Sequence, residues 1–364
     1  MKIIFICGSL DPGKDGVGDY TRRLSGELIK KELDVRIISL NDKSIEFVED
    51  TIQEDCGCNI PVLRLPGKLS WSDKLRLSQE YIKNFKPIWI SLQFVPYSFH
   101  SKGLPWMLVS KLRLLTHSYK VHIMFHELWL GIPLNDLSFK DRMVALLQRS
   151  MIQTLTKNLS PDLITTSIEV YREALSGSNV SILPLFGNIP VKDVKVGKTK
   201  ENIKVVHFGT FTFNETDFRN QINLLNAIRM KYCKTLMFNI VGRGGQAKDR
   251  MLAIIKSVIN DAIIVDHGEL NLDEISSCFR SNDIGLSRAN AVLAGKSGST
   301  IAMLEHGLPV LLRGKRTKLD THLKNCYNKQ LFFADDEGIP LEKNDEFGRL
   351  PEIAELFVNY LKNK

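Results

Sequence analysis

Short apolar runs alternate with longer amphipathic stretches along almost the whole chain, and this alternation is the strongest constraint on its fold. Runs such as IIFIC (3–7) and IWISLQFV (88–95) are almost continuously apolar, whereas DYTRRLSGELIKKE (19–32) has apolar residues at helical spacing. Continuously apolar strands separated by helices predict a parallel sheet covered by helices on both faces. Further strands are expected in the first half at 35–40, 61–65, 121–126, 163–167 and 181–186, and a second long helix at 139–159.

The pattern restarts after residue 202. IKVVHFG (203–209) has the pattern of a new first strand and is followed by helical QINLLNAIRMKY (221–232). Because single cores usually stop growing at ~250–300 residues, the 364-residue chain is expected to form two domains. We predict an α/β protein with two facing, doubly wound parallel-sheet domains and a cleft between them, where the carboxyl ends of the strands meet the ligand. Later strands are expected at 236–242, 262–268, 283–288 and 309–313.

The predicted domains are residues 1–190 and 191–350. The segment 188–202 is polar, Lys-rich and without periodicity, which is typical of a linker. Residues 351–364 contain an amphipathic helix that begins with Pro351, at a position that proline tolerates. We expect this last helix to pack back toward the first domain.

The charge balance is mildly basic, 49 − 41 = +8. The excess is spread over both halves, so no arm for nucleic acid is expected. Such a surface suits anionic small substrates or an anionic membrane face, and it suits an ordinary globular protein equally well.

Cysteine usage indicates no metal centre. The six cysteines are scattered, and Cys56 and Cys58 are too close together for the usual zinc spacing. Reduced thiols in a cytoplasmic protein are therefore expected. No run reaches the ~18 apolar residues of a membrane span, and MKIIFICGSL lacks the apolar region of a signal peptide.

The first candidate site follows the first apolar run. CGSLDPGKDGVGDYTRRL (7–24) is a glycine-rich loop that leads into a helix. Gly16, Val17 and Gly18 can bring the backbone close to a ligand and offer N–H groups to an anion. A structural turn explains these glycines about as well, and the third glycine of the dinucleotide fingerprint is missing.

A second candidate site lies in VHIMFHELW (121–129). His126 and Glu127 end a buried strand, at the edge where parallel sheets bind ligands. The alternative for His126 is a buried structural histidine with satisfied hydrogen bonds. His122 is expected on the opposite side of the strand, in a packing role.

The second half offers two more strand ends. Gly209 and Thr210 follow its first strand, where Gly209 lets the chain turn. Arg243 lies in a glycine-rich loop after the next strand. It either faces a phosphate or is an ordinary loop charge.

The segment GKSGSTIAMLEHGLPVLL (295–312) combines a polar start with a buried helix. Gly298, Ser299 and Thr300 suit a helix start, whose partial positive charge favours a phosphate. Lys296 and Arg288 would add full charges for a diphosphate. Glu305, about two helical turns later, could accept hydrogen bonds from sugar hydroxyls. The alternative is a capped core helix with one solvated glutamate.

Together these segments resemble the retaining GT-B glycosyltransferases, specifically family four. The resemblance rests on DGVGDYTRRLSGEL, ISLQFVPYSF, FHELW, LPLFGNIP, FGTF and KSGSTIAMLEHGLPV, in this order. It implies metal-independent transfer of a sugar from a nucleotide-diphosphate donor to an acceptor hydroxyl. The donor would bind the C-terminal domain and the acceptor the N-terminal one. The implied donor contacts are Gly16 and Gly18 over the diphosphate, His126 on the sugar, Gly298, Ser299 and Thr300 on the distal phosphate, and Glu305 on the ribose.

Two departures from that family bear on function. The family's first glutamate is replaced by Ser297, and the usual Arg and Lys after the second domain's first strand are missing from 209–215. Lys296, Arg288 and Arg243 are the candidates to replace these cations, and Glu127 is a candidate helper in catalysis. A nucleotide-sugar epimerase of similar fold and a weakly catalytic nucleotide-sugar binder remain as alternatives.

The expected partners are a nucleotide sugar and a glycan or lipid-linked acceptor, as in polysaccharide biosynthesis. No cofactor is expected, and the oligomeric state stays open. The basic, amphipathic SKGLPWMLVSKLRLL (101–115) would allow peripheral contact with the inner face of a membrane. A core helix with snorkelling lysines is the alternative for this segment.

Overall fold

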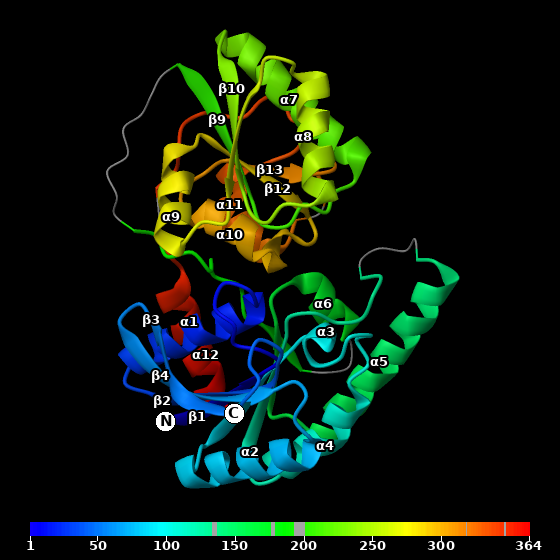
Figure 1. Ribbon diagram of the computed structural model, residues 1–364, viewed down its shortest axis with the longest axis vertical. Helices are drawn as coiled ribbons and strands as arrows, with labels where there is room; N and C mark the ends of the chain where they lie inside the picture. The colour runs from blue at the N-terminus through cyan, green and yellow to red at the C-terminus, as the bar shows by residue number, and fades with distance from the viewer. Residues whose placement is uncertain (133–136, 176–178, 193–200, 318, 346) are drawn as a thin grey trace. The chain divides into compact units, whose positions relative to one another are not determined.

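The computed structural model describes residues 1–132, 137–175, 179–192, 201–317, 319–345 and 347–364. The chain folds into two compact units (Figure 1). The first contains Met1–Pro184 together with Leu350–Lys364, and the second contains Leu185–Arg349. The division falls after Pro184, whereas the sequence places the boundary at residue 190. Part of the predicted linker 188–202 lies outside the described residues.

The first unit is built on an eight-stranded sheet with the order β3-β4-β2-β1-β5-β6-β7-β8. Strands β1 (Lys2–Cys7) and β5 (Trp89–Phe94) pair at its centre, and every residue of β5 is buried. Burial on both faces explains why these runs are continuously apolar. The other strands are β2 (Asp34–Asp42), β3 (Glu49–Asp55), β4 (Cys58–Pro66), β6 (Lys120–Phe125), β7 (Leu163–Thr166) and β8 (Val180–Ile182).

Strand β3 is absent from the sequence prediction. Its sequence, EDTIQED, is largely exposed at the edge of the sheet, so it lacks the apolar signal of a buried strand. It pairs antiparallel with β4 through a two-residue turn at Cys56 and Gly57, whose φ angles are +47° and +80°. Positive φ at both positions is what a tight type I′ hairpin requires.

The helices of the first unit include its C-terminal segment. Helix α12 (Leu350–Lys362) contacts α1 (Gly16–Lys30), and its Phe357 ring lies 5.9 Å from the Phe5 ring of β1. The last helix thus completes the core of the first unit. The remaining helices are α2 (Trp71–Phe85), α3 (Pro96–Phe99), α4 (Trp106–Thr116), α5 (Phe139–Leu159) and α6 (Glu169–Ala174).

The second unit is built on a six-stranded parallel sheet with the order β11-β10-β9-β12-β13-β14. Its strands are β9 (Asn202–Phe208), β10 (Thr235–Val241), β11 (Ile263–Gly268), β12 (Ile284–Asn290), β13 (Val310–Arg313) and β14 (Leu331–Phe332). The order reverses between β9 and β12, which makes their carboxyl ends the switch point of a doubly wound sheet.

Helices cover both faces of this second sheet. Val205 of β9 packs in one core cluster with α7 (Glu215–Tyr232) and α8 (Gln246–Val258). Its neighbour Val206 packs in another with α9 (Leu272–Ser281) and α10 (Gly298–Glu305). A shorter helix, α11 (Thr321–Tyr327), follows β13. Two α/β units with mainly parallel sheets confirm the predicted fold class.

Among the residues that the structure describes, no helix combines the length and hydropathy that a membrane crossing requires.

Candidate functional site

A glycine stands at the carboxyl end of three neighbouring strands of the second unit. Gly209 follows β9, Gly242 follows β10 and Gly268 is the last residue of β11, with φ angles of +110°, +138° and +62°. The Gly209 N–H donates to the Val241 carbonyl at 3.1 Å. A Cβ on Gly242 would lie 2.5 Å from the Gly209 carbonyl oxygen, so only glycine fits there. Gly242 therefore has a packing reason, whereas a Cβ on Gly268 would meet nothing within 4 Å.

The start of α10 lies against the carboxyl edge of this sheet. A Cβ on Gly209 would be 3.8 Å from both Cβ and Oγ of Ser299. The helix is capped by Ser297, whose Oγ accepts from the Thr300 N–H at 3.4 Å. The Thr300 hydroxyl bonds Ser297 Oγ at 2.8 Å and Ser287 Oγ of β12 at 2.7 Å. This hydroxyl network fixes the positive end of α10 at the switch point.

The predicted site residues around α10 differ in accessibility. Gly298 and Ser299 are half-buried, whereas Thr300 is buried and holds the cap. Lys296 is half-buried in the 3₁₀ turn Ala294–Lys296, directly before Ser297. The first turn of α10 therefore offers its amides at Gly298 and Ser299.

Two of the predicted cations come from different parts of the second unit. Arg288 is exposed near the end of β12, and its Nη1 donates to Thr212 Oγ1 in the loop after β9 at 2.9 Å. Arg243 forms an exposed ion pair with Glu269. Arg288 thus ties β12 to the loop after β9, whereas Arg243 is engaged with a carboxylate.

Sequence reasoning missed His207 and Arg313, which line a small cavity with Arg288. The cavity holds about 10 Å³, enough for one water. The buried Nε of Arg313 has no hydrogen-bond partner and lies 3.5 Å from Asp217 Oδ2. Arg313 ends β13, so the strand-end rule that selected Arg288 would also have selected it.

His207 fixes the loop after β9. Its Nδ1 lies 3.0 Å from the Leu286 carbonyl oxygen and its Nε2 lies 3.3 Å from the Thr210 carbonyl oxygen. Burial lowers the pKa of His207, although both carbonyl oxygens favour the charged ring. Thr210 itself is exposed, so its side chain remains accessible at the edge.

Glu305 lies at the far end of α10. It is 2% exposed, and its Oε1 accepts from the Gly187 N–H at 3.0 Å and the Arg349 N–H at 3.3 Å. These two amides lie next to the points where the chain passes between the units. Glu305 is therefore not the solvated glutamate that the alternative describes. The contact of Glu305 with a ribose stays a prediction. A ribose hydroxyl would have to bind a carboxylate that already accepts hydrogen bonds from two main-chain amides.

In the first unit, Asp15 caps α1. Its Oδ1 accepts from the N–H groups of Val17 at 3.1 Å and Gly18 at 2.7 Å, so these amides are already paired. Burial raises the pKa of Asp15. A Cβ on Gly18 would lie 2.5 Å from the Ser9 carbonyl oxygen, which gives this glycine a packing reason. Gly16 is exposed, and a Cβ there would meet nothing within 4 Å.

His126 is buried directly after β6 and begins a chain of polar contacts. Its Nε2 lies 2.9 Å from Gln93 Oε1. Gln93 Nε2 donates to Ser91 Oγ at 2.8 Å, and Ser91 Oγ lies 2.8 Å from His122 Nδ1. His122 Nε2 lies 2.8 Å from Thr165 Oγ1. We call His126, Gln93, Ser91, His122 and Thr165 the histidine relay.

The relay favours one tautomer of His126. Gln93 presents its oxygen to His126 Nε2, so this contact favours the tautomer with the proton at Nε2. Tyr20 packs edge-on against the ring at 4.8 Å, so the first turns of α1 and His126 lie together. Glu127 follows, half-buried.

The expectation that His122 lies opposite His126 is wrong. The strand period of two places residues four apart on the same face, and both rings join one hydrogen-bonded chain. His122 also packs against the Phe357 ring at 5.1 Å. Burial lowers the pKa of His122 to about 3.

Within the described residues, no group of three or more His, Cys, Asp or Glu side chains is placed to hold a metal ion.

No protein-family model matches the sequence, and no curated protein sequence matches it. Solved structures do match. WaaG, a glycosyltransferase involved in lipopolysaccharide biosynthesis, has a TM-score of 0.55 and 11% identity, covering 99% of this chain and 93% of WaaG. Anabaena HepE, solved with UDP and glucose, has a TM-score of 0.53 and 12% identity, covering 100% of this chain and 90% of HepE.

A UDP-GlcNAc 2-epimerase from Methanocaldococcus jannaschii also matches, with a TM-score of 0.52 and 11% identity over 100% of both chains. Identities this low show the fold and leave the activity to the residues of the site. The two α/β units and these structural neighbours establish that the chain has the GT-B fold.

Proposed function

We propose that this protein is a retaining, metal-independent glycosyltransferase of the family-four type. It would move a sugar from a nucleotide-diphosphate donor to a hydroxyl of a glycan or lipid-linked acceptor in polysaccharide biosynthesis. The observation that supports this most is the start of α10 against Gly209, at the switch point of the second sheet. Helix starts at such points favour phosphate groups.

The proposed chemistry depends on stabilising the leaving diphosphate. Negative charge builds on its oxygens as the glycosidic bond breaks, and fixed donors lower the barrier most when they face that charge. The amides of Gly298 and Ser299 with Lys296 and Arg288 are the proposed donors. The departing phosphate oxygen accepts the acceptor's proton, so no dedicated base is needed.

The first unit is proposed to contribute to sugar recognition. His126, oriented by the relay, would contact a hydroxyl of the donor sugar. Gly16 leaves room at the start of α1 for the donor. Glu127 is the proposed helper in catalysis.

The test is turnover of nucleotide sugars selected by thermal shift, which detects ligands that stabilise the folded protein. Lys296→Ala and Arg288→Ala are each expected to lower kcat roughly 10²-fold. The matched control is Lys231→Ala, an exposed lysine on α7. Full activity in both site variants would contradict the proposed role of α10.

An epimerase is the second candidate because UDP-GlcNAc 2-epimerases share the fold at the same level of similarity. A transferase needs a second substrate, whereas an epimerase does not. Incubation with a nucleotide sugar alone separates them: an epimerised nucleotide sugar would favour the epimerase. Binding without turnover across a panel of acceptors would indicate a non-catalytic binder.

A further inference from the structure

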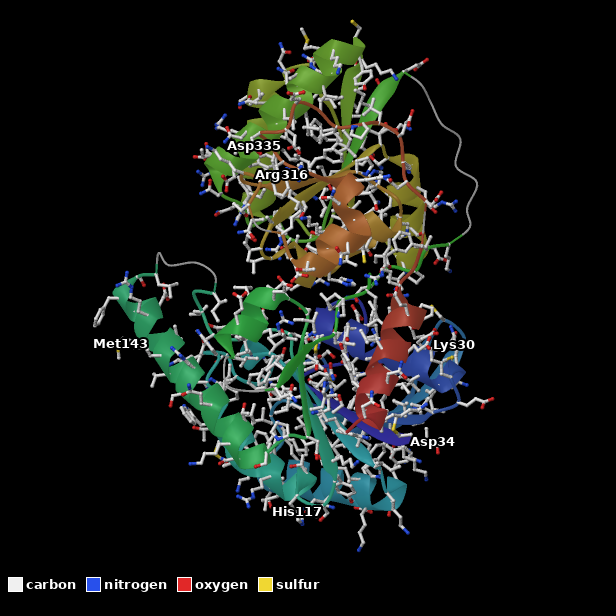
Figure 2. The ribbon with its side chains drawn as sticks, turned by 180° about the vertical axis from the view of Figure 1, so that it is seen from behind. Lys30, Asp34, His117, Met143, Arg316 and Asp335 are labelled. Atoms are coloured by element: carbon white, nitrogen blue, oxygen red, sulfur yellow. The ribbon has the colours of Figure 1, made fainter. Side chains whose placement is uncertain are left out.

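The first three turns of α5 present apolar side chains outward. Phe139 is 82% exposed, Leu146 59%, Met143 46% and Leu147 45%. These four residues, here called the α5 stripe, follow the spacing i, i+4, i+7, i+8, which places them on one side of a helix. Figure 2 shows Met143 on the outer part of this helix. A run of large exposed apolar residues of this kind marks an interaction surface.

The α5 stripe is separate from the helix's core face. Ala145, Met151, Ile152 and Leu155 are buried, so α5 already has an apolar face inside the unit. In the second half of α5, the exposed positions are polar: Ser150, Gln153 and Lys157. An ordinary surface helix is polar along its whole outer side. Within α5, the second half follows this pattern and the first half does not.

Basic residues flank the α5 stripe. Lys140, Arg142 and Arg149 are exposed within the same turns. Over 139–159 the chain has four basic residues and one acidic residue, Asp141. The neighbouring α4 adds Lys111 and Arg113 and no acidic residue. This charge is complementary to an anionic surface.

The sequence placed the membrane contact on 101–115 instead. Helix α4 buries Leu108, Val109, Leu112 and Leu115 in the core. It leaves Trp106, Met107 and Leu114 exposed. The alternative interpretation of 101–115, a helix packed in the core, therefore holds for the four leucine and valine residues. Helix α5 exposes more apolar surface than α4 does. The sequence pattern of 139–159 predicts an amphipathic helix there but no outward apolar face.

We propose that the α5 stripe docks this protein on an anionic lipid membrane. The four apolar side chains would enter the boundary between headgroups and acyl chains, and Lys140, Arg142 and Arg149 would contact anionic headgroups. An in-plane helix with an apolar face and cationic flanks has the form of an interfacial anchor. A second copy fits less well, because pairing this face with itself would bring its basic flanks together.

The first test is co-sedimentation of the full chain with phosphatidylcholine vesicles that contain or lack phosphatidylglycerol. We expect binding that needs the anionic lipid and weakens with salt. Phe139→Ser combined with Leu146→Ser should lower the partition coefficient about tenfold or more, since two exposed apolar side chains are lost. The matched control is Met230→Ser, an exposed methionine on α7 of the second unit, which should bind like the wild type.

The second test measures insertion. Phe139→Trp should add fluorescence that brominated lipids quench, whereas Gln153→Trp on the polar half of α5 should not. Both substitutions are at exposed positions, so we expect both variants to fold like the wild type.

Three outcomes would overturn the proposal. They are absence of wild-type binding to anionic vesicles, equal loss in the Met230→Ser control, and equal quenching of both tryptophan variants. A dimer in solution that the Phe139→Ser/Leu146→Ser variant dissolves, without vesicle binding, would assign the α5 stripe to a second copy. Because no donor sugar is involved, these results are independent of the proposed activity.

Discussion

His122 is the residue whose protonation state follows most directly from its surroundings. It is completely buried, and its two ring nitrogens face the hydroxyls of Ser91 and Thr165, which a neutral imidazole satisfies. Its position in a strand was evident from the sequence. Its role was not, because the relay depends on the pairing of Ser91 with His122 between β5 and β6, and strand register is a tertiary property.

We predict that His122 stays neutral from pH 8 down to about pH 4, because burial lowers its pKa to about 3. Histidine NMR titration of wild type and His122→Gln identifies its signal. The folded pKa is below the unfolded value, so this contribution to stability is complete above about pH 6.5 and is lost as the pH falls toward 3. The slope is about 1.4 kcal/mol per pH unit. A midpoint near 6.5 would contradict the buried relay.

We predict that Glu305 holds in place both segments in which the chain passes between the two units. Glu305→Ala removes the acceptor of the Gly187 and Arg349 amides and should cost about 3 kcal/mol of local stability. Hydrogen exchange should accelerate at 187 and 349, with little change in β9. The control is Glu269→Ala, which removes an exposed carboxylate. Unchanged exchange at both amides would argue against this role.

At the scale of elements, Asp42 joins three segments of the first unit. At the end of β2, its carboxylate accepts from the Leu10 N–H at 3.0 Å and from Arg64 Nε of β4 at 3.0 Å. Burial acts to raise the pKa of Asp42, but hydrogen bonds from Arg64 and Ser44 hold it below its usual value. The loop that leads to α1 is therefore tied to the sheet by one carboxylate.

We predict that Asp42→Asn destabilises the first unit by about 3 kcal/mol, because Arg64 loses a buried counter-charge. All four tryptophans, Trp71, Trp89, Trp106 and Trp129, belong to this unit, so urea unfolding followed by tryptophan fluorescence reports on it alone. The lowered folded pKa means that the wild type keeps this stabilisation above about pH 4 and loses it as the pH falls further. A variant with unchanged midpoint and acid sensitivity would refute the assignment.

The elements of the fold could largely be predicted from the sequence. Central strands such as β1 and β5 are buried and mostly apolar, and α10 has a hydroxyl cap before an apolar run. Strand β3 was missed because its stability comes from pairing with β4 rather than from burial. Of the candidate site, the sequence selected Arg288 near the end of its strand but missed Arg313. The partners that engage Arg243 and Glu305 come from other elements, so the sequence could not reveal them.

At the scale of the whole molecule, α12 completes the core of the first unit from the far end of the sequence. Phe357 is fully buried between Phe5 and His122. Phe357→Ala is predicted to lower the unfolding free energy of that unit by about 3–5 kcal/mol. Tryptophan fluorescence measures it, and hydrogen exchange of β9 should be unaffected. Glu355→Ala, exposed on the same helix, is the control. Equal loss of protection in β9 would show that the units do not unfold separately.

The second unit interrupts the first, because residues 185–349 lie between the two segments of one core. On the ribosome, Phe5 and its neighbours are translated before the inserted unit, and the helix that covers them is translated after it. The inserted unit, whose residues are contiguous, can finish folding before the surrounding one. The apolar surface around β1 therefore stays without its covering helix until the inserted unit has been translated.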